Sequence, residues 1–378
     1  MLRAQPDGTT DASRHSHENT ARPEPVEGRA WGPATFASWF DKLARRGFHG
    51  FGAGRRPMTP QHDSPTLTVS AFAKINLTLE VLGRRDDGLH EVATVLQTID
   101  LADGLRFRHA EAMSLRCRGM PRTPDNLIIR AANLLRDAIG VSAGAWIHCA
   151  KRIPLAAGLG GGSADAAATL RGLNQLWGVG LDEERLLELA SLLGADVPYA
   201  LRGGTALATG NGRTLKWLPD APRHWVVLVP LHGDDPAKTA EMYRRLLPRD
   251  MTDGTLARRQ AVAITAGAVD YGCVRSAFLR AAEDRWPEVS RALDALLVAA
   301  ACAATLSGAG PSVVGLYRTR AAALEGMKAV RAEGLPARLC RFVVPADARP
   351  SAACRRNLLV AGAGPQQCQT NSDEPDRP

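Results

Sequence analysis

The sequence predicts an α+β fold arranged in two domains, on the basis of three observations. Apolar and polar residues alternate over residues 69–82, which is typical of a β-strand. Several other segments repeat their apolar residues with the period of an amphipathic helix. The chain has 378 residues, and because a domain usually contains about 100 to 200 residues, this length favours two domains with a shared interface.

The composition is that of an ordinary globular protein. Hydrophobic residues make up 45% of the chain and charged residues 23%, which excludes a collagen, a coiled coil and a wholly disordered protein. The longest nearly apolar run, residues 295–306, is shorter than the roughly 18 residues that a spanning helix needs. We therefore expect a soluble protein without a membrane partner.

The charge balance argues against a nucleic-acid partner. The 47 Lys and Arg residues exceed the 39 Asp and Glu residues, for a formal charge of +8. A nucleic-acid-binding protein is expected to cluster basic residues among aromatic ones, whereas here the basic residues are dispersed and aromatic residues make up 5%. The modest excess suits a small polyanionic substrate.

The cysteines and the two ends of the chain carry little functional signal. Seven scattered cysteines without a Cys-x-x-Cys pair predict free thiols in a reducing cytoplasm, without a disulfide framework or a structural zinc. Residues 1–57 resemble a disordered extension, and Met58 is a candidate start of translation; a targeting peptide is the alternative. Residues 346–378 resemble a disordered tail.

The central elements follow in order along the chain. In the first strand Ala73, Ile75, Leu77, Leu79 and Val81 share one face and polar residues share the other, so we expect a half-buried strand. Further strands are predicted at residues 104–108, 145–150, 225–230 and 312–317, and helices at residues 127–139, 163–177, 182–193, 239–246 and 291–301. The composition softens at residues 220–223, which predicts domains at residues 66–220 and 224–345.

A glycine-rich segment between a predicted strand and a predicted helix is the strongest local motif. Four of the five residues from Gly158 to Gly162 are glycines, so backbone N–H groups can approach a ligand closely. Ser163 is a suitable N-cap for the helix, whose positive end then faces the loop. The motif predicts a phosphate site. It matches neither the Walker A motif nor the dinucleotide fingerprint, and a flexible turn is the alternative.

Two further segments supply candidate catalytic side chains. In Gly-Ala-Asp-Val-Pro, Gly194 ends a helix and Pro198 is expected to hold Val197 extended, which fixes Asp196 as a group able to accept a proton or bind a metal. The alternative is a turn or capping carboxylate. In the first strand Lys74 and Asn76 point the same way, which by itself is also typical of a solvated strand face.

Taken together, these motifs resemble one family. Ala-Lys-Ile-Asn-Leu, Asp-Gly-Leu-His, Pro-Asp-Asn-Leu, the glycine-rich loop, Gly-Ala-Asp-Val-Pro and Ser-Gly-Ala-Gly occur in the order seen in 4-diphosphocytidyl-2-C-methylerythritol kinases, members of the GHMP kinase superfamily. The resemblance runs from about residue 67 to 317 and is densest over residues 71–210. It implies a GHMP-kinase-like fold with an N-terminal ATP-binding domain, a C-terminal ferredoxin-like domain and an active site in the cleft between them.

The resemblance also implies an activity. Such kinases transfer the γ-phosphoryl group of ATP to the tertiary 2-hydroxyl of the methylerythritol moiety, a step of the non-mevalonate route to isoprenoids (terpenoids). Asp196 would accept the hydroxyl proton, and Lys74 would keep Asp196 ionised and stabilise developing charge. His90 would contact the cytosine edge, Tyr243 would stack on cytosine, and Asn76 would lie near the polyol hydroxyls.

The resemblance places ATP on the glycine-rich loop and its flanks. Asn126 and Lys151 match positions near adenine and ribose, and Mg²⁺ would bridge the β- and γ-phosphates, with Ser163 as a candidate ligand. The loop residues expected to contact ATP are Pro154, Leu155, Ala156, Ala157, Gly158, Leu159, Gly160, Gly161, Gly162, Ser163 and Ala164.

Two departures from the family pattern stand out. Leu89 replaces the tyrosine that stacks on cytosine in such kinases, which leaves Tyr243 as the remaining aromatic; a core tyrosine is its alternative role. Residues 275–278 replace an Asn-Asp-like pair, with an effect expected on packing more than on chemistry.

Two other functions remain open at this point. A different GHMP kinase shares the glycine-rich loop but is not expected to show Gly-Leu-His and Gly-Ala-Asp-Val-Pro together. A non-catalytic nucleotide-binding protein is expected to lack Lys74 or Asp196. The expected partners are small molecules, ATP and a cytidine diphosphate-linked polyol, and the chain is expected to be a monomer or weak dimer.

Overall fold

The computed structural model describes most of the central part of the chain, residues 66–120, 125–140, 142–231 and 238–343. The predicted extension at residues 1–57, with its candidate start, and the predicted tail at residues 346–378 lie outside the described residues. Within the described ranges, no helix combines the length and the apolarity needed to cross a membrane. The cysteines there are free thiols, as predicted, at Cys117, Cys149, Cys273, Cys302 and Cys340.

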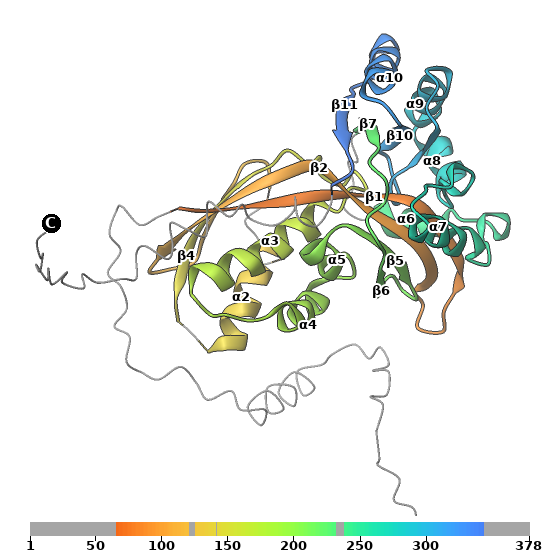
Figure 1. Cartoon of the computed structure of the whole chain (residues 1–378). Helices are drawn as coiled ribbons and strands as arrows, with labels where there is room; N and C mark the ends of the chain where they lie inside the picture. Colours follow the sequence, from red (N-terminus) through yellow and green to blue (C-terminus); the bar gives the residue numbers. More distant parts are fainter. Residues whose placement is uncertain (1–65, 121–124, 141, 232–237, 344–378) are drawn as a thin grey trace, which may run out of the picture. The chain divides into compact units, whose positions relative to one another are not determined.

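The described strands form two sheets, and the larger one is built on two long antiparallel strands (Figure 1). Its strand order is β3-β4-β2-β1-β8, with β5 paired to β2 and β6 paired to β5. The strands are β1 (Leu67–Arg84), β2 (His90–Ala110), β3 (Ser114–Cys117), β4 (Gly144–Ala150), β5 (Thr205–Thr209), β6 (Thr214–Trp217) and β8 (Arg275–Ser276).

Strand β1 is buried on both faces from Ala73 to Val81, so the expectation of a half-buried strand is wrong for this part, although Thr68 and Ser70 near its start are exposed. The polar residues Lys74, Asn76, Thr78 and Glu80 are as inaccessible as the apolar ones between them, and each is hydrogen-bonded, as buried polar groups require. The Thr78 hydroxyl donates to the Cys273 carbonyl at 2.7 Å, and Glu80 accepts from the Ala257 amide at 2.7 Å.

The alternation along β1 also changes phase. The pairing with β2 shifts register between Asn76 and Thr78, and such a bulge moves the side chains that follow it, up to the next shift after Val81, to the opposite face. Leu79 therefore lines the same cavity as Lys74 and Asn76, instead of packing with Ala73. The sequence pattern placed Leu79 on the other face. The alternation of apolar and polar residues continues unchanged through the bulge, so the sequence does not reveal the extra residue.

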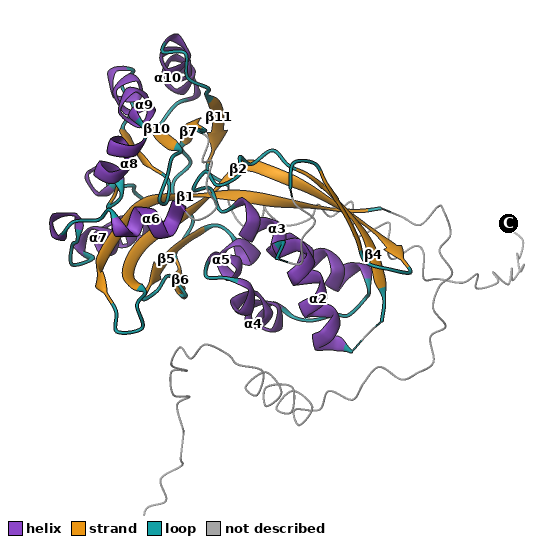
Figure 2. Cartoon of the chain, turned by 180° about the vertical axis from the view of Figure 1, so that it is seen from behind, coloured by secondary structure: helices purple, strands orange, loops and turns teal. Residues whose placement is uncertain are grey.

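Four helices cover one face of the larger sheet (Figure 1, Figure 2). They are α2 (Leu127–Ile139), α3 (Gly161–Leu176), α4 (Glu183–Leu193) and α5 (Asp196–Arg202). Helix α3 lies especially close to β2. A Cβ added at Gly172 would lie only 2.4 Å from Cε2 of Phe107, so the absence of a side chain there permits this close approach. This contact fixes the height of α3 above the sheet.

The smaller sheet is antiparallel with strand order β11-β7-β10-β9. Its members are β7 (Trp225–Val229), β9 (Ala303–Leu306), β10 (Val313–Tyr317) and β11 (Arg338–Arg341), and its helices are α8 (Leu279–Arg285), α9 (Pro287–Val298) and α10 (Arg320–Ala332). Val227 and Val313 pack with these helices. Leu228 and Val314 face the other way and share a core with Ile75 of β1.

The remaining helices lie between the sheets in sequence: α6 (Lys238–Arg244), α7 (Thr255–Thr265) and short 3₁₀ turns at Pro248–Asp250 and Tyr271–Cys273. The predicted domain boundary falls in the loop between β6 and β7, where the chain passes from one sheet to the other. The division into two domains stays a prediction.

Most predicted elements coincide with observed ones, and the differences have local causes. The helix predicted at residues 127–139 is α2. Helix α9 begins at Pro287, earlier than predicted, because proline is well suited to a first helical turn. The sequence pattern found only the end of β2, because residues 92–99 are buried on both faces and do not alternate.

Candidate active site

The glycine-rich loop leads directly into helix α3. Gly160 is the N-cap, with φ of 68°, and α3 begins at Gly161. The expectation that Ser163 caps this helix is therefore wrong, because the left-handed cap conformation favours glycine and starts the helix earlier. Ser163 lies within the first turn, where backbone N–H groups lack intrahelical acceptors.

The loop is closely packed, which argues against a flexible turn. A Cβ added at Gly158 would lie 2.1 Å from the Ser307 carbonyl oxygen, and one added at Gly160 would lie 2.9 Å from Cγ of Lys74. The Ser307 hydroxyl donates to the Gly158 carbonyl at 3.0 Å. A second glycine-containing loop, residues 307–310, thus lies against the first.

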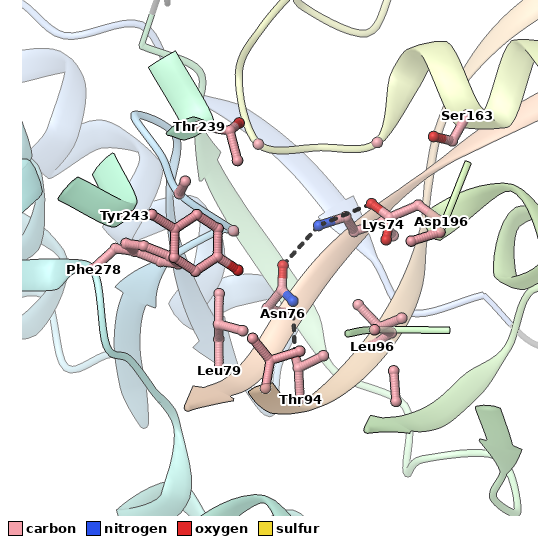
Figure 3. A pocket seen from close by; sticks show the side chains of 18 of the residues that line it. Lys74, Asn76, Leu79, Thr94, Leu96, Ser163, Asp196, Thr239, Tyr243 and Phe278 are labelled. Carbon is pink, nitrogen blue, oxygen red and sulfur yellow. Dashed lines mark hydrogen bonds and ion pairs between the residues drawn. The ribbon is translucent and has the colours of Figure 1, made fainter. Parts of the chain in front are cut away.

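Three polar side chains meet beside the loop (Figure 3). Lys74 Nζ donates to Asn76 Oδ1 at 2.8 Å and lies 3.9 Å from Asp196 Oδ2. Asn76 Nδ2 donates to Thr94 Oγ1 at 2.7 Å, and Thr94 donates in turn to the Thr78 carbonyl at 2.6 Å. This chain of hydrogen bonds fixes the Asn76 amide and the Lys74 ammonium.

The environments of Lys74 and Asp196 differ. The Lys74 side chain is 10% exposed and that of Asp196 is 40% exposed. Burial lowers the pKa of Lys74 below its usual range, while Asp196 acts in the opposite direction. The backbone amide of Lys74 also donates to the Leu159 carbonyl at 3.0 Å, which ties β1 to the glycine-rich loop.

Asp196 is the first residue of α5, not part of an extended segment. Val197 is helical, so the expectation that Pro198 holds it extended is wrong. A proline is accepted in the first turn of a helix, and burial of Val197 and Tyr199 anchors that turn in the fold. The carboxylate is therefore presented to the cavity by a helix start.

Aromatic rings gather on the opposite side of Asn76 from Asp196 (Figure 3). Tyr243 stacks on His90 with ring centroids 4.3 Å apart and meets the edge of Phe278 at 4.9 Å. Burial, and next Asp196, raises the pKa of Tyr243 to about 12. Leu89 is 51% exposed. Residues 275–278 were expected to affect mainly packing. Phe278 also lines the cavity, so this segment contributes to the site as well.

A single cavity of about 480 Å³ brings many of these groups together. It is lined by Lys74, Asn76, Leu79, Val92, Thr94, Leu96, Ala156, Gly158, Gly160, Ser163, Ala195, Asp196, Ala208, Asn211, Gly212, Lys238, Thr239, Tyr243, Phe278, Gly308 and Ala309. Of the loop residues predicted to contact ATP, Ala156, Gly158, Gly160 and Ser163 are among them.

Neither Asn126 nor Lys151 lines this cavity, although Lys151 Nζ would lie 3.3 Å from a Cβ added at Gly161 of α3. Asn126 caps α2 by accepting from the Ile128 amide at 2.9 Å. Lys151 Nζ donates to Asp103 at 2.5 Å and to Asp165 at 2.7 Å. Burial acts to lower the pKa of Lys151, but these two carboxylates raise it. Both ATP contacts stay predictions.

Several lining residues carried no assigned role in the sequence. Gly308 and Ala309 belong to a recognised motif, whose two glycines were the available signal. Thr94 gave no local signal, because only the pairing of β2 with β1 brings it to Asn76. Lys238 and Thr239 open α6 and reach the cavity through the tertiary fold.

Comparisons with known proteins agree with this geometry. The family model of the GHMP kinases N terminal domain matches residues 126–204, and that of the GHMP kinases C terminal matches residues 276–335. A crystal structure of 4-(cytidine 5′-diphospho)-2C-methyl-D-erythritol kinase aligns with TM-score 0.63 and 33% identity over 73% of this chain and 99% of that one. Homoserine kinase from Cytophaga hutchinsonii, at 20% identity and TM-score 0.57 over 76% of this chain and 98% of that one, shares the fold.

Two curated relatives are similar over most of their length. The 4-diphosphocytidyl-2-C-methyl-D-erythritol kinase of Pelotomaculum thermopropionicum is 47% identical over 66% of this chain and 88% of that protein. The kinase of the same name from Gloeobacter violaceus is 40% identical over 68% of this chain and 87% of that protein. At this identity and coverage, the chain belongs to the 4-diphosphocytidyl-2-C-methyl-D-erythritol kinase family of the GHMP kinases.

Proposed function

We propose that this kinase transfers the γ-phosphoryl group of ATP to the 2-hydroxyl of 4-diphosphocytidyl-2-C-methyl-D-erythritol, a step of the non-mevalonate isoprenoid route. The observation that carries the proposal is the Lys74–Asp196 pair, 3.9 Å apart, beside a glycine-rich helix start in one cavity. The named relatives supply the identity of the acceptor.

The glycine-rich loop binds the ATP phosphates in this proposal. The first-turn amides of α3 and the positive end of its dipole favour an anion in front of the loop. Gly160 gives phosphate oxygens access to these amides, because it carries no side chain. Lys74 lies against Gly160, where its ammonium can stabilise negative charge that develops on the phosphoryl group during transfer.

Asp196 accepts the proton of the acceptor hydroxyl. A tertiary alcohol is a poor nucleophile, so a nearby base lowers the barrier to its attack. Lys74 lies 3.9 Å from Asp196 and can stabilise negative charge that develops on the acceptor oxygen. Asn76, held by Thr94, presents its amide toward the polyol, and Tyr243 with His90 forms the cytidine side of the site.

The residues present fit a magnesium ion that is held mainly by substrate phosphates. Among the described residues no group of three or more His, Cys, Asp and Glu side chains could hold a metal. Mg²⁺ normally keeps several waters and takes one or two protein oxygens besides phosphates, and the Ser163 hydroxyl, which lines the cavity, can supply one. When bound, the ion would neutralise charge on the β- and γ-phosphates.

The test is a panel of acceptors. The purified full chain is incubated with Mg-ATP and either the cytidylylated methylerythritol, mevalonate, homoserine or galactose, and ADP release is followed with ³¹P NMR of the product. We expect a phosphate monoester on the cytidylylated compound alone. Transfer to another acceptor instead would assign a different GHMP kinase activity, and ATP binding without transfer would indicate a non-catalytic protein.

A further inference from the structure

Lys238 is a buried cation in the cavity that has no role in the proposed chemistry so far. It is the first residue of α6 and is 4% exposed. Its ammonium donates to the Gly310 carbonyl, which leaves further N–H donors of that group available. Within the described part of the chain, no carboxylate lies at ion-pair distance from it.

Among the described residues, the charges around Lys238 do not compensate its own. Lys74 on β1 and Arg285 on α8 both act on it as like charges. Arg285 is paired with Glu241 of α6, and Asp196 of α5 lies beside Lys74. Burial, then Lys74 and Arg285, lowers the pKa of Lys238 to about 8. A buried ammonium is costly without an opposite charge, so this position calls for an anion.

The position of Lys238 defines the kind of anion. Gly310, which accepts from Lys238, closes the second glycine-containing loop, and Ser307 of that loop donates to the Gly158 carbonyl. Lys74 Nζ lies 3.5 Å from the position of a Cβ added at Gly308 of the same loop. Both ammonium groups therefore lie where the two loops meet, in front of the proposed phosphate-binding helix start.

We propose that the Lys238 ammonium binds a phosphate oxygen of the bound substrates, as a second cation beside Lys74. This inference rests on the proposed function for the presence of phosphates in the cavity. The phosphate belongs either to the terminal groups of ATP or to the diphosphate of the acceptor. Lysine is well suited to both, since it acts as a point charge toward phosphate.

Three variants separate the charge of Lys238 from its hydrogen bond. Lys238→Gln keeps a donor for Gly310 without the charge, Lys238→Met removes both, and Lys238→Arg keeps both. Lys328→Met is the matched control, because the Lys328 side chain is 70% exposed on α10. We expect the Gln and Met variants to lose about 10- to 100-fold in kcat/KM, the size of a lost charge-assisted hydrogen bond, while the Arg variant retains most activity.

The kinetic constants identify the phosphate. A rise in KM for ATP alone assigns the terminal phosphates of ATP, and a rise in KM for the acceptor alone assigns its diphosphate. Calorimetry with ATP and with cytidine 5′-diphosphate repeats this comparison without turnover, so it still tests Lys238 if the acceptor panel contradicts the proposed function. Equal affinities for both nucleotides in wild type and Lys238→Gln, with unchanged kinetics, would overturn the inference.

The pH profile tests the charge directly. kcat/KM reports the unliganded protein, so it should fall as pH rises through about 8, where Lys238 loses its proton. In Lys238→Arg this fall should move to higher pH, because arginine stays charged. Lys74, Tyr243 and Asp196 are unchanged in that variant. If kcat/KM falls at the same pH in wild type and Lys238→Arg, or if Lys238→Gln has full activity, the charge of Lys238 is not needed and its role is only structural.

Discussion

At the residue scale, Lys74 and Asp196 differ in how exposed their side chains are, and this difference suits them to different roles. Lys74 is nearly inaccessible and fixed by Asn76, whereas Asp196 is 40% exposed and open to a substrate. Burial lowers the pKa of Lys74, and the nearby Asp196 carboxylate partly opposes this effect.

We predict that Asp196→Asn lowers kcat by about 10² to 10⁴, the usual effect of losing a general base. The affinity for ATP should change little, since the carboxylate acts on the acceptor hydroxyl. Steady-state kinetics and ATP calorimetry measure the two effects. Asp284→Asn, whose side chain is 61% exposed, is the control; a near-normal kcat for Asp196→Asn would exclude Asp196 as the base.

The same substitution should lower the pKa of Lys74 further. Burial already lowers it, and Asp196 is the charge that opposes this effect. Without that charge the ammonium loses its proton at a still lower pH. NMR titration of lysines labelled with ¹³C at Cε, assigned with Lys74→Ala, would measure the shift. An unchanged Lys74 titration in Asp196→Asn would show that the pair is not coupled in solution.

At the scale of elements, two glycine-containing loops and one helix start act as a unit. Gly158 adopts φ of 80° and touches the loop of Ser307, while Gly160 caps α3 against Lys74. The close approach removes the room that a side chain would need. The glycine-rich loop is therefore positioned by contacts with β1 and with the later loop of residues 307–310.

We predict that Gly158→Ala raises KM for ATP and lowers kcat/KM about 100-fold, because a Cβ at this position displaces the loop from Ser307. Gly178→Ala is the matched control, since Gly178 has φ of 63° but nothing within 4 Å of an added Cβ. It should cost about 1 to 2 kcal/mol of stability from backbone conformation alone, with normal kinetics. Equal kinetics for the two variants would show that the close contact between Gly158 and Ser307 does not position the loop for ATP.

At the scale of the whole described structure, residues of the two sheets pack together in shared hydrophobic clusters. Ile75 and Leu77 of β1 pack in the same cluster as Leu228 and Val314 of the smaller sheet. The cavity takes its lining from a second cluster, in which Leu79 and Val92 of the larger sheet pack with Phe278 and Ala309. Disturbing the shared core should therefore destabilise both sheets together.

We predict that Leu228→Ala lowers the free energy of unfolding by about 2 to 5 kcal/mol, as for other buried leucines. Amide exchange should accelerate in β1 as well as in β7 and β10. Val262→Ala, at a position 70% exposed on α7, should change stability by less than about 0.5 kcal/mol. Faster exchange confined to the smaller sheet would mean that the two sheets unfold independently.

Much of the fold and several candidate site residues could be predicted from local sequence, and the errors have both local and long-range causes. The period of 3.6 residues located α2 and α4, because each buries one stripe of side chains. The predicted cap of α3 and the predicted conformation of Val197 were wrong. Glycine and proline are both compatible with a helix start, and residue preferences alone do not show at which position the helix begins. The phase change in β1 was missed because it exists only in the pairing with β2.

The sequence by itself determined the α+β character, the glycine-rich helix start and the candidate pair Lys74 and Asp196, since these depend on residue type and short spacing. Only the tertiary structure decided which groups meet. It brought Thr94 to Asn76, His90 to Tyr243, and Lys238 to the second glycine-containing loop. Contacts between segments far apart in the chain arise from packing the whole core, and packing energy is not encoded in any short stretch of residues.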